Sequence, residues 1–125
     1  MSEHDKLQQK CWLLAWNKYP ETRYCLFHVP NELRPYKGES KLAHVIRIQQ
    51  ARGVGLLAGV LDFIFHWNNR MYILDIKVGK DSLSDAQKKF IETTERNGGK
   101  FLGEISDLDQ FEQILVSIIR PKTAV

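Results

Sequence analysis

The sequence lacks the features that would place it in a membrane or in an oxidising compartment. Its 125 residues contain no apolar run near the ~20 residues that a membrane-spanning helix needs, so we expect no membrane association. Only two cysteines, Cys11 and Cys25, are present, too few for a disulfide framework. The first residues are polar and acidic, unlike a secretory signal peptide. We therefore expect a cytoplasmic protein that folds without disulfide bonds.

Internal repeats, low-complexity tracts and linker-like stretches are also absent. Hydrophobic residues make up 43% of the chain and charged residues 26%, which argues against wholesale disorder. A chain of this length has the size of one domain and can bury a core of its own. The sequence therefore predicts a single domain over residues 1–125.

Hydrophobic spacing predicts helices and strands in the order α-β-α-β-β-α-β-α. Apolar residues recur at helical spacing in four segments, residues 4–18, 40–53, 84–97 and 107–119. Short apolar runs predict strands at residues 24–29, 60–67, 71–78 and 100–105. This order predicts an α/β domain, with a small mixed sheet between flanking helices.

The two central strands carry acidic residues in a defined relation to each other. Asn68 and Asn69 join the strands, and asparagine tolerates the positive φ that a two-residue hairpin turn requires. With such a turn, Asp62 lies directly opposite Asp75, and opposed side chains project from one face about 4.5–5.5 Å apart. Strand periodicity places Lys77 on that same face. A three-residue turn would move Asp62 out of register.

Opposed carboxylates on central strands repel each other and lose hydration, which gives a purely structural protein little benefit. A hard divalent cation removes the conflict, because carboxylates, a backbone carbonyl and waters are the ligands that Mg²⁺ prefers. Lys77 would then orient a water or stabilise developing negative charge. Two plainer interpretations remain open: the acids lie in solvent at the strand ends, or Lys77 simply neutralises one of them.

The pattern Asp62…Asp75-Ile76-Lys77 resembles the signature of PD-(D/E)XK nucleases, and its surroundings resemble their virus-type replication-repair nuclease (VRR-NUC) branch. The resemblance extends between residues 7 and 105. The segments that carry it are Val29-Pro30-Asn31-Glu32, Gln50-Ala51-Arg52-Gly53-Val54, Ala58-Gly59-Val60-Leu61-Asp62, Ile73-Leu74-Asp75-Ile76-Lys77-Val78-Gly79 and Leu83-Ser84-Asp85-Ala86-Gln87. The fold that this resemblance implies is restriction-endonuclease-like.

The resemblance also implies roles for individual residues. Asp62 and Asp75 would bind Mg²⁺ or Mn²⁺ with the Ile76 carbonyl, Lys77 would be the catalytic lysine, and Gln87 would support the site. Gln87 has an equally good second explanation, since a Ser-x-x-Gln pattern is a helix capping box.

Two positions depart from the family pattern. The proline common before the first aspartate is Leu61 here. The family often has a glutamate in the first helix that points at the metal. The candidates for that position in this chain are Glu3, Asp5, Gln8 and Gln9, of which we name Gln9.

Basic residues flank the candidate site in the sequence and suggest a polyanionic substrate. They are Arg34, Lys37, Lys41, Arg47 and Arg52 before the first acid, and Lys80, Lys88 and Lys89 after the second. Such charges neutralise a phosphate backbone without reading bases. We therefore expect a metal-dependent DNA endonuclease selective for branched DNA such as a Holliday junction, acting as a homodimer. The alternatives are an inactive nuclease-fold module that binds nucleic acid, and a ribonuclease acting on structured RNA.

Overall fold

The computed structural model describes residues 1–30 and 35–121. Along the described chain, the elements follow the predicted α-β-α-β-β-α-β-α order, with one short 3₁₀ helix, η1, added. They are α1 (Glu3–Lys18), η1 (Pro20–Thr22), β1 (Leu26–His28), α2 (Lys41–Gly53), β2 (Phe63–Trp67), β3 (Arg70–Ile76), α3 (Asp85–Arg96), β4 (Lys100–Ile105) and α4 (Leu108–Ile119). None of these helices is long and apolar enough to cross a membrane.

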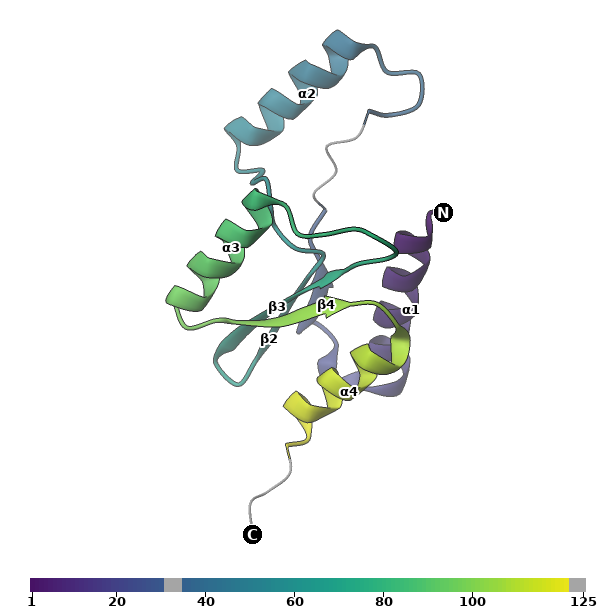
Figure 1. Ribbon diagram of the computed structural model, residues 1–125, viewed down its shortest axis with the longest axis vertical. Coiled ribbons are helices and arrows are strands. Elements are labelled where there is room, and N and C mark those ends of the chain that lie inside the picture. The colour runs from purple at the N-terminus through teal and green to yellow at the C-terminus, as the bar shows by residue number, and fades with distance from the viewer. Residues whose placement is uncertain (31–34, 122–125) are drawn as a thin grey trace.

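The four strands form one mixed sheet in the order β1-β2-β3-β4. Strands β1, β2 and β3 pair antiparallel, and β4 pairs parallel to β3 after the crossover through α3. Helices α1 and α4 lie on one side of this sheet and α3 on the other (Figure 1). The prediction of a small mixed sheet flanked by helices is confirmed.

The main core lies between the sheet and the pair α1 and α4. Strand alternation points Phe63, Phe65 and Ile76 into this core, where they meet Cys11 of α1 and Phe111 of α4. All five side chains are at most 1% exposed. Cys11 is therefore a core residue, as expected of a cysteine in a protein without disulfides.

Helix α2 does not cover the sheet. It stands away from the other elements (Figure 1), and its Leu42, Val45 and Ile46 are 70%, 43% and 45% exposed. Ile48 is its one buried residue. Helical spacing correctly predicts this helix, but it did not predict that the helix leaves the layered body.

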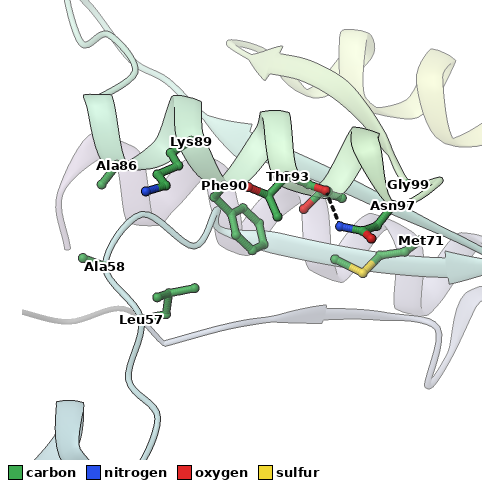
Figure 2. Close-up of a pocket in the computed structure, with 10 residues that line it drawn as sticks. Leu57, Ala58, Met71, Ala86, Lys89, Phe90, Thr93, Asn97 and Gly99 are labelled. Carbon is green, nitrogen blue, oxygen red and sulfur yellow. Dashed lines mark hydrogen bonds between the residues drawn. The ribbon is translucent and has the colours of Figure 1, made fainter.

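An apolar groove of about 440 Å³ lies between α3 and the segment before β2. Leu57, Met71 and Phe90 line it (Figure 2). The rest of the lining includes small side chains of α3 and the amide of Asn97, which follows α3. Its lining contains one charged side chain, Lys89, and no carboxylate. The groove is therefore not lined by Asp62 or Asp75.

Candidate active site

The turn between β2 and β3 has the geometry that the acidic pair requires. Asn68 and Asn69 both adopt positive φ, 48° and 62°. The resulting register pairs Trp67 with Arg70 and continues regularly to Phe63 with Leu74. The prediction of a two-residue turn is confirmed, and the register brings the next residue, Asp62, beside Asp75.

Asp62 lies just outside the strand predicted to contain it. β2 begins at Phe63, and Asp62 occupies a bend. Its own N–H donates to Asp75 Oδ1 at 3.1 Å, and its Oδ2 accepts from the Ile76 N–H at 2.8 Å. Side-chain oxygens thus replace backbone carbonyls where the ladder ends. This arrangement holds both carboxylates at the carboxyl end of β3.

One acid is buried, the other is half-buried, and the two are close enough to interact strongly. Asp75 is 2% exposed. The pKa of Asp62 is raised to about 6, first by burial and then by the hydrogen bond and charge of Asp75. The Ile76 N–H and His4 oppose this shift without cancelling it. The burial of Asp75 and the low exposure of Asp62 exclude the interpretation that both acids lie in solvent.

Lys77 provides positive charge on one side of the pair. Its Nζ lies 2.6 Å from Asp75 Oδ2, and its side chain is 15% exposed. The β3–β4 pairing fixes the backbone at this point, because the Lys77 N–H donates to the Ile105 carbonyl at 2.9 Å. Lys77 therefore compensates Asp75 directly, while Asp62 keeps a raised pKa.

Gln87 makes both of the contacts that the sequence left as alternatives. It completes the capping box of α3, in which its Oε1 accepts from the Ser84 N–H at 2.9 Å. The same oxygen lies 3.4 Å from Lys77 Nζ, and its Nε2 donates to Asp75 Oδ2 at 3.4 Å. One side chain thus ties the start of α3 to the acidic pair.

The first helix reaches the site through a residue that the sequence analysis did not name. His4 Nε2 lies 2.9 Å from Asp62 Oδ2. Burial lowers the pKa of His4, but the charge and hydrogen bond of Asp62, helped by Asp5, outweigh this and raise it. The sequence held a usable signal, since His4 continues the inward stripe of Leu7, Cys11 and Ala15 by one turn.

The four first-helix candidates from the sequence are placed differently from one another. Glu3 pairs with Lys6 at 3.2 Å. Asp5, Gln8 and Gln9 line a groove of about 350 Å³ that also includes His28. No contact between Gln9 and either acid is seen in the described residues, whereas His4 of the same helix contacts Asp62.

The donor set fits a small divalent cation. Asp62 and Asp75 would supply carboxylate oxygens, and Ile76, the residue after Asp75, would supply a backbone carbonyl. Among residues 1–30 and 35–121, no three His, Cys, Asp or Glu side chains converge as a ready ligand cluster. Two carboxylates and one carbonyl leave ligand positions of an octahedral cation open to other atoms, waters included.

The basic residues proposed to contact DNA are placed differently from one another. Arg34 lies outside the described residues. Arg47 is half-buried and engaged locally, since its guanidinium donates to Glu39 at 2.9 and 3.1 Å and lies 3.7 Å from the centre of the Tyr36 ring. The others are exposed, namely Lys37, Lys41, Arg52, Lys80, Lys88 and Lys89.

Replacing Asp62 with asparagine should stabilise the protein in the presence of EDTA. The variant removes one of two buried like charges, and the shift from 3.8 to about 6 represents ~3 kcal/mol at pH 7. We expect roughly 1–2 kcal/mol of this in urea unfolding, because the amide keeps only part of the hydrogen bonding. Asp81→Asn, at an exposed carboxylate, should change nothing. A destabilised Asp62→Asn would show that Asp62 serves the fold.

Comparison with known proteins supports the fold independently. No family model matches the chain, and no curated protein matches its sequence. Among solved structures, the fold is similar to that of a protein described as "VRR_NUC domain protein", with a TM-score of 0.68. The two are 17% identical, over 96% of this chain and 90% of that chain. The protein therefore has the fold of that VRR_NUC domain protein, the fold that its sequence resemblance implied.

Proposed function

We propose that this protein is a Mg²⁺- or Mn²⁺-dependent DNA endonuclease that hydrolyses phosphodiester bonds. The observation that carries the proposal is the close pair of the half-buried Asp62 and the buried Asp75, with the Lys77 ammonium 2.6 Å from Asp75 Oδ2. Buried like charges are costly in a structural role. A catalytic role would account for this cost, because the fold is of the nuclease type and a lysine lies beside the two acids.

The acids and Ile76 would hold the cation. Asp62 Oδ2 is oriented by the Ile76 N–H, and Asp75 Oδ1 by the Asp62 N–H, so neither carboxylate rotates freely. When bound, such a cation polarises a phosphate oxygen and lowers the pKa of a coordinated water. The fixed carboxylates would place it without reorganisation during the reaction.

Lys77 and Gln87 would act on the attacking water and the scissile phosphate. Lys77 Nζ lies between Asp75 Oδ2 at 2.6 Å and Gln87 Oε1 at 3.4 Å, so two acceptors orient its ammonium. An ammonium held in this way donates to an oxygen that gains negative charge. Gln87 would act as a positioning residue, because it contacts Lys77 and Asp75.

The substrate would be DNA recognised by its backbone. Exposed lysines lie before and after the acidic strands, including Lys41 on α2, Lys80 in the segment before α3 and Lys88 on α3. Such groups bind phosphates without reading sequence. We therefore propose selectivity for DNA structure, with branched DNA as the preferred form. Two symmetric cuts in a junction require two sites, so the active species would be a homodimer.

The test is a cleavage panel of end-labelled single-stranded, duplex, flap and four-way DNA with Mg²⁺ or Mn²⁺. We expect branched substrates to be nicked fastest. Asp75→Ala should lower the rate at least about 100-fold, which corresponds to ~2.7 kcal/mol. Asp81→Ala is the matched control and should cleave like the wild type, because its carboxylate is exposed in a loop.

Two results would reject the proposal. If Asp75→Ala cleaves as fast as the wild type, the activity does not come from this site. If no DNA is cut but the wild type binds it, the chain is a binding module. Matched RNA substrates of the same shape belong in the panel, because faster cleavage of RNA would replace DNA as the substrate.

A further inference from the structure

His4, in the first turn of α1, contacts Asp62 through its side chain. Its Nε2 lies 2.9 Å from Asp62 Oδ2, the oxygen that also accepts from the Ile76 N–H. Neighbouring ligand atoms of an octahedral cation with bonds of 2.0–2.1 Å are about 2.9 Å apart. The imidazole nitrogen and the carboxylate oxygen are joined here by a hydrogen bond, and their separation also matches that of two adjacent ligands.

The second nitrogen of His4 has the partner that a metal-binding histidine usually has. Nδ1 lies 3.4 Å from Asp5 Oδ1, one residue along α1. A carboxylate at the far nitrogen fixes the ring orientation and leaves the near nitrogen to bind. Ser2 caps this first turn by accepting from the Asp5 N–H at 3.1 Å, which holds the backbone that carries both residues.

The His4 ring is also sheltered. Its side chain is 29% exposed, compared with 17% for Asp62, so solvent reaches only part of it. Asp62 contacts both His4 and Asp75, and therefore bridges α1 to the acidic end of β3. No other histidine side chain in the described residues is seen to contact either carboxylate. The His28 ring contacts Asp62 only at the Asp62 backbone carbonyl, with Nδ1 2.6 Å from that oxygen.

We propose that His4 is a nitrogen ligand of the cation site and makes the site prefer Mn²⁺ over Mg²⁺. The proposal rests on the proposed function, since it concerns the same cation. Mg²⁺ favours an all-oxygen shell, whereas imidazole is a better ligand for transition metals. On binding, the Nε2 lone pair replaces its hydrogen bond to Asp62, and the displaced proton goes to solvent.

The decisive measurement is pulsed electron paramagnetic resonance of Mn²⁺ bound to the full chain. Directly coordinated imidazole nitrogen gives electron spin-echo modulation that ¹⁵N-histidine labelling shifts. We expect this signal in the wild type and in His28→Ala, and we expect it to be lost in His4→Ala. Calorimetry of the same proteins should show Mn²⁺ affinity at least about tenfold weaker in His4→Ala. Mg²⁺ affinity should change by less than threefold.

A carboxylate at this position provides the complementary variant. His4→Glu should bind Mg²⁺ and Mn²⁺ with similar affinity and give no nitrogen signal. The proposal is overturned if the wild type shows no nitrogen signal, if the signal survives in His4→Ala, or if His4→Ala weakens both cations equally. Each of these outcomes leaves the proposed function intact when binding still depends on Asp75. A different outcome would reject the cation site itself: the wild type and Asp75→Ala bind Mn²⁺ equally, or neither binds it.

Discussion

Replacing Lys77 with methionine is expected to reduce DNA cleavage about 10²–10³-fold, the usual effect of removing one donor that stabilises transition-state charge. Methionine keeps the length and apolar stem of lysine but removes the ammonium that lies 2.6 Å from Asp75 Oδ2. The rate would be measured in single-turnover conditions on the best substrate of the panel. Lys89→Met, at an exposed lysine of α3, is the matched control and should lose much less.

The same variant separates catalysis from simple neutralisation. Without the ammonium, the pair Asp62 and Asp75 carries more uncompensated charge, so Mn²⁺ should bind Lys77→Met at least as tightly as the wild type. If Lys77 only neutralises Asp75, a bound Mn²⁺ would neutralise it instead, and saturating Mn²⁺ would restore the wild-type cleavage rate. A persistent loss at saturating Mn²⁺ is therefore expected, and full recovery would contradict the catalytic role.

The sequence predicted the central hairpin because its determinants are local. Asn68 and Asn69 set the turn length, turn length sets the register, and the register brings Asp62 to Asp75. The strand boundary was less accurate, since β2 begins at Phe63 and not at residue 60. Residues 60 and 61 are still hydrophobic, but the strand pairing ends at Phe63. Beyond it the Ile76 N–H donates to the Asp62 side chain and not to a backbone carbonyl. Hydrophobic periodicity carries no information about this change of acceptor.

Contacts between distant elements were harder to predict. His4 lies 58 residues from Asp62 in the sequence, and only the packing of α1 onto the sheet brings them together. Arg47 looks like a DNA-binding residue in a basic segment, yet Glu39 and Tyr36 hold it. Helical spacing in residues 41–53 predicts a helix but carries no information about which element, if any, covers it.

Gly59→Ala is expected to be among the most damaging single changes in the chain. Gly59 has φ +90°, and a Cβ there would lie 2.4 Å from the Ala86 carbonyl carbon and 2.8 Å from the Gln87 nitrogen. Both contacts are to backbone, so no side chain can rotate away. Either the segment leading into Asp62 or the first turn of α3 must move, and that turn carries Gln87.

Gly55→Ala separates this clash from the cost of backbone strain. Gly55 has φ +111°, but a Cβ there meets nothing within 4 Å. Strain alone should cost about 1–3 kcal/mol in urea unfolding, and Gly59→Ala should cost a further ~1–3 kcal/mol for the forced displacement. Cleavage by the folded Gly59→Ala protein should also fall, since Gln87 leaves Asp75 and Lys77. Equal destabilisation by the two variants would show that the close approach of Gly59 to α3 positions nothing.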